Sequence, residues 1–546
     1  MKTKRVLAVL LGVSLAATAL GACTQKKPTT GNSNDLQEVT TSDTYPIQTD
    51  AEFRWWSTLP SQVTAYAASM NDTIHKTYLE EATGVKIKFE HPVAGQEAAA
   101  FNILQSTDNM PDLIEYGWAG YPGGPQKAID DNFIISLNSY IEKVCPNLRK
   151  IYEENPEYAK QMVTDQGNYF EFPFIRSDEK LATYMTYIIR KDLLDKAGLP
   201  VPETFDEWET ALRAFKAMGI KAPISLRLDN NQLGNFSPFT SKFGFVGNFY
   251  HDENNKVKFG PYEESFGEWV KMLKGWYDEG LLDKEFANTD LKRIGAMVAA
   301  GENGGIFCTI GGEFGNWLPA IPTDSGIQYV ATKIPAAKRG ETPMFGQKDF
   351  PIKDSVAIST SCKNKEVAAR FLDFGYSEAG HILYNFGKEG ESFTYEDGPR
   401  GSHIPTYTPI VVDENQNGGL TVAQGMSKYI RGYLNGPFVQ DLEYIYQYYQ
   451  RPEQKDALEM FETDTLKYKL PILSLTSEEQ QRYTDIMTPI NTYRQETLAK
   501  MISGKMPISE LGNYYKQLKD LGIEEAIQIQ QAAYDRYLQR SPLKYN

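Results

Sequence analysis

The chain has 546 residues, 41% hydrophobic and 23% charged, and its 71 acidic side chains against 56 basic ones give a formal net charge of −15. A single compact core does not organise a chain this long, so we expect several domain-sized units, and the apolar fraction excludes wholesale disorder. Binding to nucleic acid, or to anionic lipid through a basic patch, requires clustered Lys and Arg, and the acidity argues against both. Four cysteines are too few for a disulfide framework at this length.

The N-terminus predicts export. Basic residues among the first five precede an apolar run over residues 6–20. Such a run spans about 22 Å as a helix, too short for a hydrocarbon core of about 30 Å, and is typical of a signal peptide. It ends in Leu20-Gly21-Ala22-Cys23, which resembles the lipobox of bacterial lipoproteins. We therefore predict a signal peptide over 1–22 and a lipid anchor at Cys23, the alternative being an ordinary signal peptide with a chance cysteine.

The residues after Cys23 are polar, rich in Thr, Ser and Asn, and almost free of aromatics. They cannot bury enough apolar surface to offset their chain entropy, so we predict a flexible tether over 23–49. No later segment approaches transmembrane length. The expected location is the extracytoplasmic face of a bacterial cell membrane, with membrane contact only through the anchor.

The body that follows shows alternating strand and helix patterns, which predict an α/β protein. Gly84 and Gly198 mark helix ends, and Thr204 with Glu207 forms a capping box at a helix start. Trp208, Trp269 and Trp276 recur at helical spacing with other apolar residues, which favours core packing over ligand contact. The expected elements are strands at 53–56, 85–89, 110–116, 184–189 and 305–310, helices at 71–82, 190–197 and from 205, and a mainly helical part from about 421 that includes a helix at 523–538.

Six sequence blocks occur in order along the chain. They are 165–173 (DQGNYFEFP), 187–194 (YIIRKDLL), 202–208 (PETFDEW), 276–283 (WYDEGLLD), 371–377 (FLDFGYS) and 386–393 (FGKEGESF). Together they resemble family 1 extracellular solute-binding proteins, the receptors of bacterial ABC sugar importers. The last two, with the long helical tail, resemble the large subgroup that serves importers of complex oligosaccharides.

The resemblance implies a periplasmic-binding-protein-like fold of type II, with two α/β lobes, a discontinuous chain and a helical C-terminal extension. Ligand would lie in the cleft between the lobes, and ABC permease subunits would be the partners of a monomeric receptor. We expect chain crossings near 172–181 and 351–358. The expected lobes are 50–175 with 352–415, and 176–351 with 416–546.

A sugar ring offers apolar faces for aromatic stacking and hydroxyls for planar polar groups. We therefore look for aromatics in loops that follow strands, a position at which similar proteins hold their ligands. Trp56 is favoured over Trp55, since neighbours on a strand face opposite sides; Glu391 could bind hydroxyls or only fix its loop. The predicted ligand residues are Trp56, Tyr116, Trp118, Tyr121, Tyr184, Glu313, Phe314, Trp317 and Glu391.

We expect no metal, no cofactor and no catalysis. The calcium loop of some large relatives would fall at 217–223, where no ligand cluster occurs. The run from Asp413 to Gly418 matches half of an EF-hand loop, but Gln424 replaces the closing Glu, which favours a solvated turn. The alternatives to a sugar receptor are an oligopeptide receptor of an ABC importer and, less favoured, an anchored glycan-degrading enzyme with two carboxylates across a cleft.

Overall fold

The computed structural model describes residues 44–107, 109–234, 238–343, 346, 348–432, 435–460 and 466–542, with only the backbone at 230, 231 and 354. The predicted signal peptide, the lipid anchor at Cys23 and most of the tether lie outside these residues. Among the residues that are described, no helix combines the length and apolarity needed to cross a membrane.

The first sheet has six strands in the order β13-β4-β10-β3-β1-β2. β1 pairs in parallel with β2 and β3, and β13 with β4, whereas β10 runs antiparallel to both of its neighbours. This confirms the first three predicted strands and their parallel arrangement. The bounds are β1 Glu52–Trp56, β2 Lys86–Glu90, β3 Leu113–Glu115, β4 Phe172–Arg176, β10 Ile352–Ile358 and β13 Val439–Gln440.

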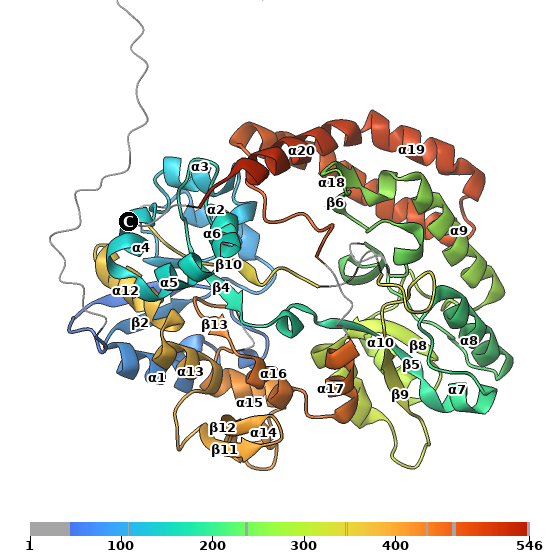
Figure 1. The fold of residues 1–546 in the computed structure, drawn as a ribbon, viewed down its shortest axis with the longest axis horizontal. Coiled ribbons are helices and arrows are strands. Elements are labelled where there is room, and N and C mark those ends of the chain that lie inside the picture. Colours follow the sequence, from blue (N-terminus) through green and yellow to red (C-terminus); the bar gives the residue numbers. More distant parts are fainter. Residues whose placement is uncertain are drawn as a thin grey trace, which may run out of the picture. The chain divides into compact units, whose positions relative to one another are not determined.

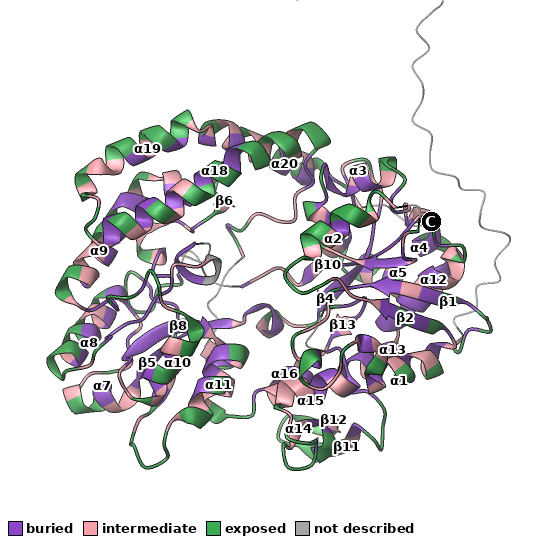
Figure 2. Ribbon diagram, turned by 180° about the vertical axis from the view of Figure 1, so that it is seen from behind, coloured by how far each residue is buried: buried purple, intermediate pink, exposed green. Residues whose placement is uncertain are grey.

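Helices surround this sheet, and its strands form a buried layer while the outer helix faces are exposed (Figures 1 and 2). The helices are α1 Ile74–Thr83, α2 Glu97–Leu104, α3 Gly124–Asp130, α4 Asn138–Val144, α5 Pro146–Glu154, α6 Pro156–Gln161, α12 Lys365–Asp373, α13 Glu378–Phe386, α14 Pro409–Val412, α15 Val422–Tyr429 and α16 Leu442–Tyr448. The hairpin of β11 Phe393–Gly398 and β12 Gly401–Tyr407 lies between α13 and α14 in the chain.

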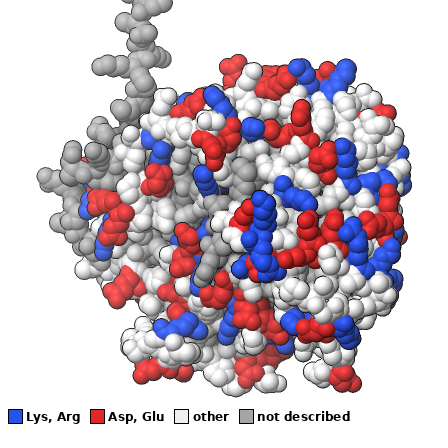
Figure 3. All heavy atoms as spheres, turned by 45° about the vertical axis from the view of Figure 1, so that its right-hand side comes forward, with Lys and Arg blue, Asp and Glu red and all other residues white. Residues whose placement is uncertain are grey.

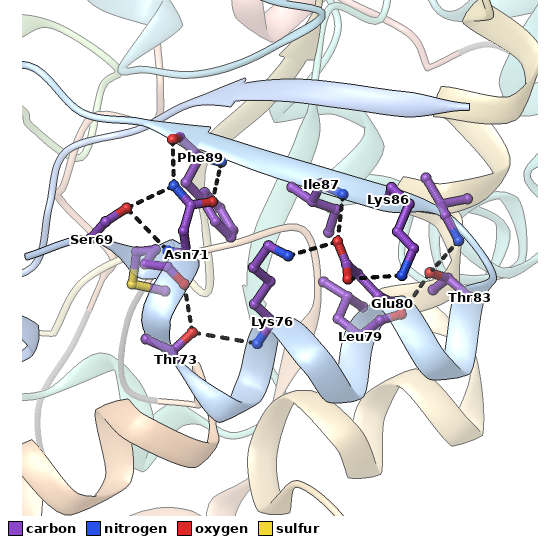
Figure 4. A network of polar contacts seen from close by, with 12 residues as sticks. Ser69, Asn71, Thr73, Lys76, Leu79, Glu80, Thr83, Lys86, Ile87 and Phe89 are labelled. Carbon is purple, nitrogen blue, oxygen red and sulfur yellow. Dashed lines mark hydrogen bonds and ion pairs between the residues drawn. The ribbon is translucent and has the colours of Figure 1, made fainter. Parts of the chain in front are cut away.

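Strand β2 is an edge of the sheet, and side chains satisfy backbone groups along it (Figure 4). The Asn71 amide donates to the Phe89 carbonyl at 2.9 Å and accepts from the Phe89 N–H at 2.8 Å. Glu80 accepts from the Ile87 N–H at 2.8 Å. These contacts occupy groups that would otherwise offer a free edge to another chain.

The second sheet is antiparallel, with the order β8-β5-β9. The Thr204 capping box forms as predicted, and Trp208, Trp269 and Trp276 are buried, which confirms them as core residues. The bounds are β5 Met185–Arg190, β8 Gly305–Thr309, β9 Tyr329–Thr332, α7 Lys191–Ala197, α8 Phe205–Ala217, α9 Glu264–Glu279, α10 Leu291–Ala299 and α11 Gly315–Trp317, with a hairpin of β6 Phe249–His251 and β7 Val257–Phe259.

The chain passes between the two sheets directly after β4 and directly before β10, and these strands are neighbours. The predicted crossing segments, 172–181 and 351–358, include the strands β4 and β10 themselves. β13 pairs with β4, and α15 packs against α1, so α15 and β13 lie with the first sheet. The lobe boundaries stay a prediction, and these contacts, with that of α16 on β12, support a boundary beyond α16 in place of 416.

The C-terminal part is helical, as the sequence predicted (Figure 1). α18 packs on α9, α20 packs on both α18 and β7, and α17 packs on β9. The bounds are α17 Pro452–Glu459, α18 Ser477–Ile502, α19 Leu511–Asp520 and α20 Ile523–Gln539. Over the face drawn in Figure 3, acidic and basic side chains are interspersed, as expected of a solvated surface.

Candidate ligand-binding site

Four of the predicted ligand residues lie in one aromatic cluster at the ends of β1 and β3. Its centre is Phe101 of α2, on which Tyr116 stacks with ring centroids 3.6 Å apart and an interplanar angle of 2°. Trp56, Trp118 and Tyr121 approach the same ring at 6.0, 5.9 and 6.2 Å. Trp118 is fully buried, whereas Tyr116 is partly exposed. Tyr116 is therefore the member with free ring surface to offer to a ligand.

The two tryptophans of β1 face opposite sides, as strand geometry requires. Trp55 is fully buried against Phe89 and Phe371, at 5.2 and 6.0 Å. The guanidinium of Arg431 lies 5.2 Å from the Trp55 ring. Trp56 faces the aromatic cluster but keeps only 5% of its surface exposed.

Arg431 is a residue that sequence reasoning missed. It is buried, and its Nη2 donates to both carboxylate oxygens of Glu115, at 3.1 and 2.8 Å. Glu115 ends β3 directly before Tyr116, so this ion pair fixes the start of the aromatic loop. The partners lie 316 positions apart in the chain, and no local pattern connects them.

The loop after β8 holds three more predicted residues. Glu313 accepts from Arg227 Nη1 at 3.0 Å and from the Thr309 N–H at 2.9 Å, and its own N–H donates to Thr309 Oγ1 at 2.9 Å. Burial raises the pKa of Glu313, and Arg227 opposes that rise. The Glu313 carboxylate is therefore already hydrogen-bonded to Arg227 and Thr309, and these bonds stabilise the conformation of the loop.

Phe314 and Trp317, from the same loop, lie in an apolar cluster between the second sheet and α10. Trp317 covers Gly295, where an added Cβ would come within 2.7 Å of the indole Nε1. Phe314 is almost fully buried, and Trp317 keeps 8% of its surface exposed. In this conformation both rings serve as core.

Tyr184 and Glu391 lie apart from these clusters but are partly exposed. The Tyr184 carbonyl accepts from the Ile310 N–H at 2.9 Å, so Tyr184 adjoins the loop that holds Glu313. Burial, and then the charge of Asp349, raise the pKa of the Tyr184 hydroxyl. Glu391 accepts from Tyr78 Oη at 2.8 Å and pairs with Lys388 at 3.0 Å.

A cavity of about 460 Å³ lies elsewhere, between β9 and α17. None of the predicted ligand residues lines it. Its polar lining is mainly acidic, with Lys333 as the one cation among the lining residues: Val201, Pro202, Glu203, Val330, Ala331, Thr332, Lys333, Glu453, Asp456, Glu459 and Met460.

No group of three or more His, Cys, Asp or Glu side chains suited to a metal ion occurs in the part of the chain that the structure describes. At the partial EF-hand match, Asp413 accepts from the Asn415 N–H at 3.0 Å and from Gln416 Nε2 at 2.8 Å. These bonds hold a turn within the loop itself.

Comparison with known proteins gives the class. Residues 60–382 match the family model described as bacterial extracellular solute-binding protein. The chain belongs to this family, and its fold is periplasmic-binding-protein-like of type II.

Individual relatives extend the similarity over the whole chain. It is 25% identical over 562 residues to the fructooligosaccharide ABC transporter substrate-binding protein FusA of Streptococcus pneumoniae, covering 97% of each chain. The structure of S. pneumoniae FusA in complex with kestose superposes with a TM-score of 0.68 at 22% identity, covering 89% of this chain and 99% of that one. A solute-binding protein from Bifidobacterium longum infantis, described as HMO binding and ABC-transporter associated, gives a TM-score of 0.68 at 18% identity, with the same coverage.

Proposed function

We propose that the protein is a lipid-anchored extracytoplasmic receptor that captures an oligosaccharide between its two lobes and delivers it to the permease of an ABC importer. The observation that carries this proposal is the end-to-end similarity to FusA, whose name specifies fructooligosaccharides. Membership of the solute-binding family supports the role of a binding protein without catalysis.

Among the predicted ligand residues we give first place to Tyr116, Tyr184 and Glu391, because these side chains keep exposed surface. Tyr116 offers a ring already braced by Phe101, so stacking on a sugar would cost little side-chain order. The other six (Trp56, Trp118, Tyr121, Glu313, Phe314 and Trp317) would reach a ligand only if the loops that bury them opened.

The anchor, the lobe division and the assembly state belong to the same proposal. Cleavage before Cys23 and lipidation of its thiol would hold the body at the membrane, with the tether as a spacer. Mass spectrometry of the mature protein tests the anchor, and the variant Cys23→Ala should release the protein into the medium. Native mass spectrometry tests the expected monomer.

Thermal-shift screening against oligosaccharides and peptides tests the central claim. A ligand that binds only the folded protein at a hundredfold excess over its Kd stabilises it by about 2.7 kcal/mol. Stabilisation by oligosaccharides alone supports the proposal, and stabilisation by peptides alone would assign an oligopeptide receptor instead. Cleavage of a bound oligosaccharide, followed by chromatography, would reveal an enzyme.

A further inference from the structure

A cluster of cations lies where the chain crosses between the two sheets. Its members are Arg176, the last residue of β4, Lys353 of β10 and Lys469, all grouped around Asp349. The Lys469 ammonium lies 2.7 Å from Asp349 Oδ1, and Lys353 Nζ and Arg176 Nη1 lie 3.4 and 3.7 Å from Oδ2. We call this group the crossing cations.

The crossing cations outnumber the carboxylate that they share. Three positive charges surround one negative charge among the side chains that the structure describes there, and the nearby Lys348 has its own partner in Glu179 at 2.7 Å. Unlike charges at a few ångströms attract strongly in a partly buried place, and the two unmatched cations repel each other to a similar degree. An added anion would relieve that repulsion.

The directions in which the pKa values of Asp349 and Lys353 shift agree with this excess of positive charge. Burial would raise the pKa of Asp349, but the charges of Lys469, Lys353 and Arg176 outweigh it and lower the pKa to about 2. The pKa of Lys353 is lowered, first by burial and then by Arg176. The single negative charge of Asp349 thus does not offset the three cations around it, which still repel one another.

The cluster is accessible, and it adjoins a residue of the proposed site. The side chains of Lys353 and Lys469 are 36% and 41% exposed, so both reach the protein surface. Arg176 is held in place by donation from Nη1 to the Phe350 carbonyl at 2.9 Å. The Asp349 N–H donates to the Ala182 carbonyl at 2.9 Å, which holds the cluster close to Tyr184, two residues further along the chain. Consistently, Asp349 raises and Arg176 lowers the pKa of the Tyr184 hydroxyl.

We infer that the crossing cations bind an anionic substituent of the transported oligosaccharide, a carboxylate or a sulfate, next to a sugar ring on Tyr184. The ligand is then an acidic oligosaccharide, and Lys353 and Lys469 determine that specificity. This inference rests on the proposed function, since it names the class of sugar for the same receptor. The competing explanation is an ion-pair network that only joins the crossing segments, and it predicts no preference for charge in the ligand.

The test compares ligands that differ only in charge. Calorimetry is run with pools of uronic-acid oligosaccharides of several linkages, the same pools after reduction of their carboxyl groups to alcohols, sulfated oligosaccharides, and neutral fructooligosaccharides. We expect an acidic pool, carboxylated or sulfated, to bind at least about tenfold more tightly than its neutral counterpart, since a hydrogen bond to a charged group contributes that much. The tighter acidic pool then identifies the substituent.

Substitutions of the crossing cations test whether this cluster causes the preference for acidic ligands. Lys353→Met should weaken the acidic ligand about tenfold or more while changing any neutral ligand little, and it should flatten the salt dependence of binding. Lys469→Met provides a second, more exposed position if the first variant folds poorly. Lys500→Met is the control, because Lys500 pairs on the exposed face of α18 with Glu496.

Two results overturn the inference. One is tighter binding of neutral oligosaccharides than of every acidic pool. The other is equal weakening of acidic and neutral ligands by Lys353→Met or Lys469→Met. If peptides bind and no oligosaccharide of either kind does, it is the proposed function that fails, so the two failures are distinguishable.

Discussion

Replacing Asp165 by Ala should loosen the C-terminal helix α20 from the first sheet. Asp165 lies between α6 and β4, and its carboxylate accepts from Arg536 Nε at 2.7 Å and from Arg540 Nη2 at 2.5 Å. Arg536 keeps a second partner in Glu479 at 2.6 Å, whereas Arg540 is left with the Lys160 carbonyl at 3.1 Å. The substitution therefore removes the carboxylate that neutralises the charge of Arg540.

The magnitude follows from burial. The Arg540 side chain is 3% exposed and the Asp165 side chain 15%, so water cannot replace the lost carboxylate well. Removing one partner of a buried ion pair costs about 3–5 kcal/mol. Because Arg536 is 31% exposed and keeps Glu479, we reduce that figure to about 2–4 kcal/mol.

Hydrogen exchange followed by mass spectrometry measures this cost locally, which is needed because a chain of this size need not unfold in two states. Opening of α20 should become about 30- to 700-fold more frequent in Asp165→Ala, given tenfold per 1.4 kcal/mol. Asp520→Ala is the control, because it removes an exposed pair with Lys516 and should cost under about 1 kcal/mol. Equal exchange of α20 in both variants would refute the reasoning.

Three further predictions concern stability. Burial, and then the charge of a neighbouring arginine, lower the pKa of His75 to about 3. The imidazole therefore stays neutral in the folded state, whereas in the unfolded state it binds a proton below about pH 6.5. Stability should therefore fall by up to about 5 kcal/mol between pH 6.5 and 3, and His75→Phe should flatten that slope in urea titrations, where an unchanged slope would contradict the assignment. Glu80→Ala should lower the free energy of unfolding in urea by about 1–3 kcal/mol, because the Ile87 N–H of β2 loses its acceptor. Lys86→Ala, which removes an exposed ion-pair partner of Glu80, should change it little. Gly295→Ala should displace Trp317 and cost about 1–3 kcal/mol by thermal or urea unfolding, with a shift in tryptophan fluorescence; an unchanged spectrum would show that the ring does not rest on Gly295.

The sequence allowed the fold to be predicted where the signal is local. The capping box of Thr204 and Glu207 forms as the spacing requires, and Gly198 ends α7 in the left-handed conformation. The alternation in β2 follows from two-residue periodicity and a half-exposed edge. Each of these features depends on residues within about four positions of one another.

The candidate site could not be predicted in the same way, because aromatic composition does not distinguish a ligand platform from a core. Trp118 follows a strand in a Gly-rich loop, as a ligand residue would, yet it is fully buried around Phe101. The ion pair of Arg431 and Glu115, and the sharing of Asp349 by Arg176 and Lys469, join segments far apart in the chain. Only the tertiary structure brings such groups together, so the charge cluster at the chain crossings could not be predicted from the spacing of residues in the sequence.

The C-terminal helices bear on how a two-lobed receptor could close. They contact second-sheet elements extensively: α18 packs on α9, and the Gly267 N–H donates to Tyr515 Oη at 3.1 Å. Their contact with the first-sheet part is narrower: Asp165 and the Lys160 carbonyl accept from Arg536 and Arg540, and α18 packs on α3. If the lobes rotate about β4 and β10, these helices would therefore move with the second sheet, and the bonds of Asp165 would strain first. A change in ligand affinity in Asp165→Ala, with the second sheet still protected from exchange, is the result expected of such a link.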